Sequence, residues 1–176
     1  PGRIDGGTMP DDIIGALSRW IKLDTQKPNT IDCALADIDI QEDGSTGILD
    51  IGDPIQPTLA MEGMQVVKSG RTTGVTVGTI IDTHASITVG YGDFDARFDD
   101  QIITSAMAAP GDSGSLLLDR NSLSPVGLLF AGSDTLVVYN KIQNVMNALN
   151  IEIVSIGDSG LTSNNNLSFM LPLFIG

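Results

Sequence analysis

The chain of 176 residues contains one cysteine, one histidine and only 5% aromatic residues. With Cys33 alone, no disulfide can form within the chain. A single thiol suits a reducing compartment, so we favour a cytoplasmic location. No apolar run approaches the roughly 20 residues of a membrane-spanning helix, and we recognise no signal peptide. We therefore expect neither a disulfide-stabilised scaffold nor a membrane protein.

Basic residues are also scarce. Nine Lys and Arg stand against 22 Asp and Glu, which gives a net charge of −13 at pH 7. Nucleic acids and anionic membranes are repelled by such a surface, so we expect neither as a partner. We also expect no metal ion and no cofactor.

The chain does have glycine and short apolar stretches in abundance. Its 20 glycines and 41% hydrophobic residues predict many short strands and turns. Residues 75–82 and 85–91 alternate at a period of two, as half-buried strands do. Residues 141–149 carry apolar side chains on one helical face and are the clearest helix. The segment 13–21 fits a helix or an irregular strand equally well. Further strands are predicted at residues 64–68, 97–106, 126–131 and 135–139.

The most informative stretch is Ala-Pro-Gly-Asp-Ser-Gly-Ser at residues 109–115. A glycine two positions before Ser113 permits a tight turn with positive φ, and the glycine after it leaves room for another group to approach. Such a turn can direct backbone N–H groups at one point, which an oxyanion hole requires. By itself the stretch equally fits a β-hairpin turn, so the rest of the chain has to decide.

Several stretches together resemble the bacterial, disulfide-free trypsin/chymotrypsin-like serine proteases in order and spacing. They are residues 68–74 (Lys-Ser-Gly-Arg-Thr-Thr-Gly) with 78–80, the serine turn at 111–114, residues 127–132 (Gly-Leu-Leu-Phe-Ala-Gly), and residues 31–36, which resemble the strand that carries the catalytic aspartate. The resemblance covers about residues 12–150. It implies an all-β fold, a double antiparallel β-barrel whose first barrel is incomplete in this chain, with a short C-terminal helix.

The resemblance also implies a division of the chain. Residues 1–55 would be the remainder of the first barrel and a linker. Residues 56–156 would form the second barrel with the helix at 141–149. Residues 157–176 would be a linker and an apolar tail. The part of this tail at 167–176 is so apolar that it must be buried on its own domain or on a neighbour, which leaves a homo-oligomer open.

Transferred by position, the resemblance assigns roles to the serine turn and its surroundings. Ser113 would be the nucleophile, and Asp32 would orient the base histidine. The N–H groups of Gly111 and Ser113 would form the oxyanion hole. Asp112 would point inward and need a cation, because a buried unpaired carboxylate is costly. Family members with a Ser-Gly-Arg turn can use its arginine, so we assign Arg71 to Asp112.

The resemblance places the specificity pocket at six uncharged residues: Met107, Ala108, Ala109, Phe130, Ala131 and Gly132. We therefore expect small or medium apolar side chains to be preferred over Lys or Arg. Two positions depart from the family pattern. Phe130 stands where a serine commonly bonds the catalytic aspartate, and Ser115 stands where glycine is usual. Either departure indicates altered geometry or a relative that has lost activity.

The base histidine is missing from its expected place. The family carries it before the aspartate, yet the 31 residues that precede Asp32 contain no histidine. His84, the one histidine, lies in a polar hairpin stretch and is expected to face solvent. The order Asp32, His84, Ser113 matches subtilisin-like proteases, but the alternating strands and helices of that fold are not predicted. Since the chain starts at Pro1, we expect the C-terminal part of a cleaved or truncated protease, partnered by an N-terminal fragment that carries the histidine.

Two functional hypotheses follow. The first is a serine endopeptidase that hydrolyses peptide bonds through an acyl-enzyme on Ser113, with a peptide or protein substrate and with autocleavage as one source of the fragment. The second is a catalytically inactive binding or assembly module on a protease fold, which the apolar tail at 167–176 supports.

Overall fold

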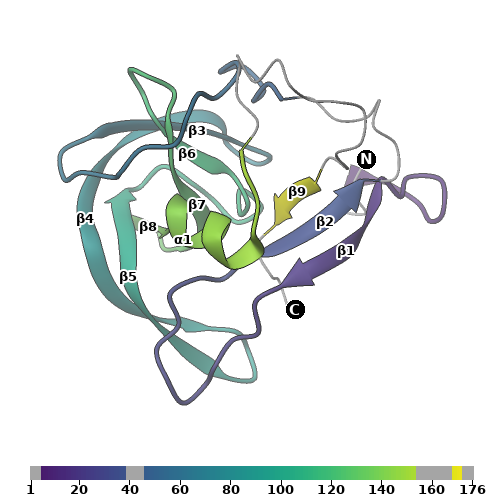
Figure 1. Ribbon diagram of the computed structural model, residues 1–176, viewed down its shortest axis with the longest axis horizontal. Helices are drawn as coiled ribbons and strands as arrows, with labels where there is room; N and C mark the ends of the chain where they lie inside the picture. The colour runs from purple at the N-terminus through teal and green to yellow at the C-terminus, as the bar shows by residue number, and fades with distance from the viewer. Residues whose placement is uncertain (1–4, 39–45, 154–167, 172–176) are drawn as a thin grey trace.

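The computed structural model describes residues 5–38, 46–153 and 168–171, and it shows a barrel flanked by a smaller sheet (Figure 1). Six antiparallel strands close the barrel in the order β3-β4-β5-β8-β7-β6. These strands are β3 (Gln65–Gly70), β4 (Gly74–Gly90), β5 (Asp95–Ser105), β6 (Leu116–Asp119), β7 (Pro125–Gly132) and β8 (Leu136–Lys141). The predicted all-β architecture with a short C-terminal helix is confirmed.

The sequence predicted two separate strands at residues 75–82 and 85–91, but the structure has the single strand β4 there. It runs unbroken over 17 residues. Its register against β5 shifts three times, between Ile80 and Asp82, Asp82 and Ala85, and Ala85 and Ile87. Bulges of this kind bend a strand without ending it. The polar residues in the middle of β4 therefore mark irregularities within one long strand and not a turn.

The smaller sheet contains β1 (Gly15–Trp20), β2 (Ala34–Ile38) and β9 (Ser168–Leu171), in the order β1-β2-β9 and all antiparallel. The ambiguous segment 13–21 is thus largely a strand. A side chain at Gly15 would place its Cβ only 2.1 Å from the carbonyl oxygen of Asp37, so this close pairing requires glycine. Four residues of the apolar tail pair with β2 of the same chain, and the rest of the tail lies outside the described residues.

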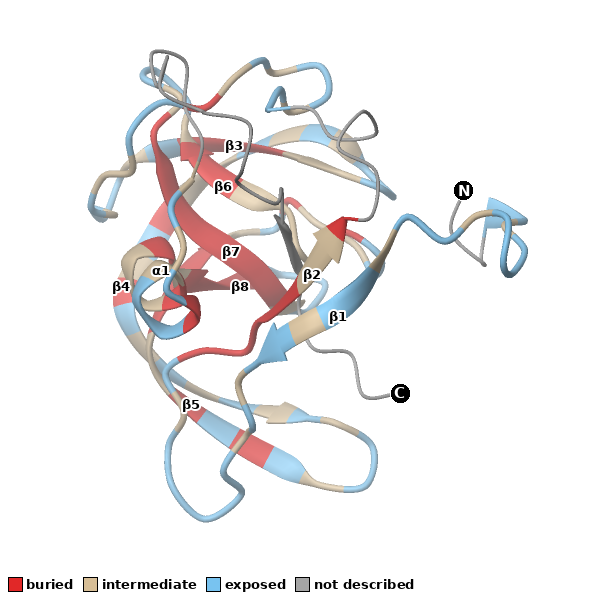
Figure 2. Cartoon of the chain, turned by 45° about the vertical axis from the view of Figure 1, so that its right-hand side comes forward, coloured by how far each residue is buried: buried red, intermediate tan, exposed pale blue. Residues whose placement is uncertain are grey.

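Helix α1 (Ile142–Leu149) confirms the clearest helix prediction and packs against residues of both sheets. It ends at Asn150, whose left-handed backbone (φ 51°) is a common helix terminator. Its buried face packs into a cluster with residues from β7, from β2 and from the segment before β2; Figure 2 shows this segment buried alongside β7 and β8. The cluster contains Ile31, Cys33, Leu35, Leu128, Ile142, Val145 and Leu149. In the part of the chain that the structure describes, no helix has the length and apolar character to cross a membrane.

Candidate active site

The serine turn lies between β5 and β6, and two left-handed glycines shape it. Gly111 has φ 100° and Gly114 has φ 89°, conformations that other residues rarely adopt. A Cβ at Gly111 would also lie 2.4 Å from the hydroxyl oxygen of Thr72. Ser113 is half-buried between them, and its hydroxyl forms no hydrogen bond within the described residues. The turn therefore presents a partly accessible serine on a rigid backbone.

Some backbone N–H groups of the serine turn donate hydrogen bonds within the described residues, and others do not. Asp112 N–H donates to Ala109 O (3.0 Å), and Gly114 N–H donates to Leu129 O (2.8 Å). Ser115 N–H donates to Asp112 O (3.1 Å). No acceptor among the described residues takes the N–H groups of residues 111 and 113. These are the two groups that the resemblance assigns to the oxyanion hole.

Ser115, which replaces the usual glycine, stabilises the turn. Its hydroxyl donates to the carbonyl oxygen of Asp112 (2.5 Å), the same oxygen that its N–H contacts. Its own carbonyl accepts the N–H of Leu129 (3.0 Å), which ties the turn to β7. The departure from the family pattern thus adds a hydrogen bond across Ser113 and leaves the unused N–H groups as they are.

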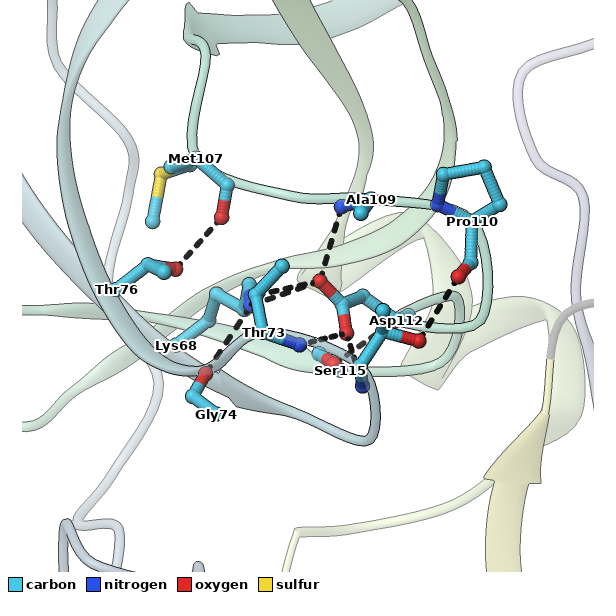
Figure 3. Close-up of polar contacts among 10 residues, drawn as sticks. Lys68, Thr73, Gly74, Thr76, Met107, Ala109, Pro110, Asp112 and Ser115 are labelled. Carbon is cyan, nitrogen blue, oxygen red and sulfur yellow. Dashed lines mark hydrogen bonds and ion pairs between the residues drawn. The ribbon is translucent and has the colours of Figure 1, made fainter. Parts of the chain in front are cut away.

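Asp112 points inward as expected, but its cation is Lys68 and not Arg71 (Figure 3). Lys68 Nζ lies 3.0 Å from Asp112 Oδ2, and both side chains are fully buried. Arg71 pairs instead with Asp5, and both of these side chains are about half exposed. The predicted Arg71–Asp112 pair is therefore wrong. Arg71 lies in the turn after β3 and extends towards solvent, whereas Lys68 lies within β3 and extends into the barrel.

The turn that contains Arg71 does hold Asp112, through its threonines. Thr73 donates its hydroxyl to Asp112 Oδ2 (2.6 Å), and the N–H groups of Thr72 and Thr73 donate to Oδ1 (2.7 and 3.1 Å). Ala109 N–H adds a bond of 3.0 Å to Oδ2. Burial by itself would raise the pKa of Asp112, but these hydrogen bonds and Lys68 lower the pKa well below its ordinary value. Asp112 therefore stays ionised and fixes the serine turn.

Sequence reasoning missed Lys68 and the two threonines as partners of Asp112. One signal was present, because Lys68 is the one charged residue of β3 and follows two valines. A lysine in such a strand is buried only when it is paired. Gly70 contributes space, since a Cβ there would lie 2.5 Å from Asp112 Oδ1.

Asp32 lies just before β2, where the smaller sheet meets the barrel, and is 2% exposed. Its backbone exchanges two hydrogen bonds with the side chain of Asn140 on β8, at 3.0 and 2.9 Å. Its carboxylate accepts a hydrogen bond from the hydroxyl of Tyr91, at 2.5 Å. Sequence reasoning missed both partners, although Asn140 is a polar residue in an otherwise apolar part of β8.

The single histidine takes no part in this site. The His84 side chain is 75% exposed, which confirms that it faces solvent. Its Nδ1 lies 2.9 Å from the Thr83 hydroxyl and its Nε2 lies 3.8 Å from Asp100 Oδ1. Within the described residues, no basic side chain contacts the Ser113 hydroxyl.

Two of the six expected pocket residues line a hollow within the part of the chain that the structure describes. A hollow of about 410 Å³ lies among β4, β5, β7 and β8, and of the six only Ala131 and Gly132 line it. Met107 and Phe130 are buried in two different core clusters, because both side chains pack inward. The hollow carries no charged side chain; its apolar lining includes Ile87, Val89, Ile103, Leu136 and Val138.

The fold has relatives among solved structures. The chymotrypsin of Cellulomonas bogoriensis shares 27% identity at a TM-score of 0.51, over 58% of this chain and 56% of that chain. Nocardiopsis protease (NAPase) shares 22% identity at a TM-score of 0.64, over 80% of this chain and 74% of that chain. Thermobifida fusca protease A shares 22% identity at a TM-score of 0.58, over 69% and 67%.

These matches are structural. No protein-family model matches the chain, and no curated protein sequence does. The match to the Cellulomonas enzyme spans little more than half of that protein. Matches to solved structures over as much as 85% of the chain agree with the closed barrel and the short helix described above. The chain has the fold of the bacterial chymotrypsin-like serine proteases.

Proposed function

We propose that this chain is the nucleophile-bearing part of a serine endopeptidase, in which Ser113 forms the acyl-enzyme. The observation that carries the proposal is the serine turn itself. It holds a half-buried serine hydroxyl without a hydrogen-bond partner among the described residues, and it leaves the N–H groups of residues 111 and 113 without an acceptor. A nucleophile next to two unused backbone donors is the arrangement that acyl transfer needs.

In the proposed reaction, a base removes the proton from the Ser113 hydroxyl while its oxygen attacks the peptide carbonyl. The N–H groups of Gly111 and Ser113 stabilise the negative charge that develops on the carbonyl oxygen. The protonated base then gives its proton to the leaving amine, and water hydrolyses the resulting ester. Asp112, paired with Lys68, keeps the turn in the conformation in which both N–H groups point to the carbonyl oxygen.

The base is proposed to come from a histidine-bearing N-terminal segment of the same protein, either cleaved and still docked or removed. The smaller sheet supports a missing neighbour. Its edge strand β1 exposes Leu17 and Trp20 by 55% and 54%, and an exposed apolar edge strand favours pairing with further chain. Mass spectrometry of the purified protein tests this. A histidine-bearing fragment should co-purify, whereas an active species of 18.5 kDa alone would contradict the proposal.

A fluorophosphonate probe, which reacts with activated serines, tests the function. The complete protein should be labelled once, and Ser113→Ala should abolish the labelling. Ser122→Ala is the matched control, because Ser122 lies in an exposed turn, where its hydroxyl donates to Asp119 and accepts the N–H of Ser124. Retained labelling in Ser113→Ala would assign the chemistry to another residue.

The second candidate is an inactive module on the same fold. It is favoured by one observation, that no base contacts Ser113 within the described residues. Absence of labelling in the complete, folded protein supports this module over the enzyme.

Specificity for apolar side chains is proposed on the hollow lined by Ala131 and Gly132, which carries no charged side chain. Ranking fluorogenic peptides by their first residue before the cleaved bond should place small or medium apolar residues first. A strong preference for Lys or Arg would contradict this.

A further inference from the structure

The main chain of Asp32 is hydrogen-bonded to the barrel independently of its carboxylate. The side-chain amide of Asn140 accepts the N–H of Asp32 at 3.0 Å and donates to its carbonyl at 2.9 Å, in a fully buried position. This two-point contact fixes where the Asp32 main chain lies. It leaves the rotation of the carboxylate about its side-chain bonds to be set by another group.

The hydroxyl of Tyr91, from the tip of the β4–β5 hairpin, makes a direct contact with this carboxylate. Its oxygen lies 2.5 Å from Asp32 Oδ2. The ring of Tyr91 stacks on Phe94, with centroids 5.2 Å apart and planes within 12°, and its N–H donates to the Phe94 carbonyl at 2.8 Å. The hydroxyl is therefore delivered by a side chain that is itself held in place.

A chain of aromatic rings connects this tyrosine to β7. Tyr91 contacts Phe98 at a centroid distance of 6.4 Å, and Phe98 contacts Phe130 at 4.9 Å. Phe98 and Phe130 are buried, so these contacts anchor the ring of Tyr91 to the core of the barrel. Phe130 cannot donate a hydrogen bond to the Asp32 carboxylate. The hydroxyl of Tyr91, from the hairpin, donates instead.

We propose that Tyr91 is the residue that positions the Asp32 carboxylate for the base histidine; this role rests on the proposed acyl-transfer function. A carboxylate has about four acceptor sites, so it can accept hydrogen bonds from a tyrosine hydroxyl and from an imidazole N–H together. Burial raises the pKa of Tyr91, and the hydrogen bond and charge of Asp32 raise it further. The hydroxyl thus keeps its proton and remains a donor. A fixed carboxylate orients the imidazole and stabilises its protonated form.

Tyr91→Phe in the complete protein tests the role, with Tyr139→Phe as the matched control. The Tyr139 hydroxyl is buried in another core cluster, next to Thr104, so its removal leaves the contacts of Asp32 unchanged. Tyr91→Phe should slow Ser113 labelling and lower kcat by about tenfold with little change in KM, as loss of a hydrogen bond to a charged group does. Tyr139→Phe should leave both unchanged.

A double-mutant cycle with Asp32→Asn separates positioning from general packing. Tyr91→Phe should lose most of its effect in the Asp32→Asn background, because the hydroxyl then has no carboxylate to orient. In ¹³C-tyrosine spectra, Asp32→Asn should shift the Tyr91 ring-carbon signal and leave that of Tyr139. An equal effect of Tyr91→Phe in both backgrounds would assign Tyr91 to packing alone.

The possible failures are distinguishable. An unlabelled wild-type protein contradicts the proposed function and this role with it. Normal wild-type labelling together with unchanged labelling of Tyr91→Phe contradicts only the role of Tyr91. Faster labelling of Tyr91→Phe also overturns it, because the tyrosine would then obstruct the site.

Discussion

Lys68 Nζ and Asp112 Oδ2 lie 3.0 Å apart, with both side chains fully buried inside the barrel next to the serine turn. Burying two charges costs several kcal/mol per ion unless further hydrogen bonds compensate. Here Lys68 also donates to the Thr73 hydroxyl and to the Gly74 carbonyl, so the ammonium has three acceptors. The position of Ser113 therefore depends on a charge pair that makes no contact with Ser113 itself.

Lys68→Met should lower the free energy of unfolding by about 3–5 kcal/mol, because it leaves Asp112 buried without its cation. Urea unfolding at pH 7 measures the loss. Arg71→Gln is the matched control. Its partner Asp5 is about half exposed, and an exposed pair contributes about 0–1 kcal/mol. Equal losses in the two variants would restore Arg71 as the cation of Asp112.

Acid should destabilise the protein partly through Asp112. The pKa of this group is lower in the folded protein than its ordinary value of 3.8, since hydrogen bonds and Lys68 outweigh the opposing effect of burial. Its stabilisation is therefore fully present above about pH 5 and is lost as the pH falls through 3.8 and below. Urea unfolding between pH 6 and 2.5 should show a steeper fall for wild type than for Asp112→Asn. Parallel curves would contradict this.

Gly70→Ala should disturb the serine turn indirectly, through Asp112. Its Cβ would lie 2.5 Å from Asp112 Oδ1, so either the carboxylate or β3 must move. We expect a loss of about 1–3 kcal/mol in stability and slower Ser113 labelling. Gly90→Ala is the comparison, because its Cβ would lie 3.3 Å from the Asp95 carboxylate, a side chain that can rotate away. The prediction fails if both variants behave alike.

His84→Ala should change neither stability nor labelling. The side chain is 75% exposed and lies 3.8 Å from Asp100, and exposed positions of this kind change stability by about ±0.5 kcal/mol. Thermal unfolding and fluorophosphonate labelling check this. Loss of labelling without loss of stability would make His84 the base after all.

Cys33 should react with thiol reagents only when the protein opens. Its side chain is fully buried next to Asp32, and burial, assisted by the charge of Asp32, raises its pKa to about 12. The reactive thiolate is then nearly absent at pH 8. Reaction with an aromatic disulfide reagent should be slow in native protein and fast in urea. Rapid reaction of native protein would show that the Asp32 segment is not packed as described.

Local patterns determined much of this protein. The serine turn, strand β7 and helix α1 were predictable because each depends on neighbours along the chain. The turn has its two glycines, and residues 126–131 and 141–149 have apolar patterns typical of a strand and a helix. The solvent-facing position of His84 follows from its polar surroundings in the same way. Residues 13–21 stayed ambiguous because their spacing satisfies both periods, and the close approach of Gly15 to Asp37 settles them as a strand.

The partners of the site depend on folding over long distances. Lys68 and Arg71 are three residues apart, and nothing in their order says which enters the barrel; the direction of each side chain at the end of β3 decides that Lys68 meets Asp112. Tyr91 and Asp32 are 59 residues apart and meet only because the bent β4–β5 hairpin returns to the smaller sheet. The serine turn was thus predictable from the sequence. The pairing of Lys68 with Asp112 and of Tyr91 with Asp32 depends on closure of the barrel.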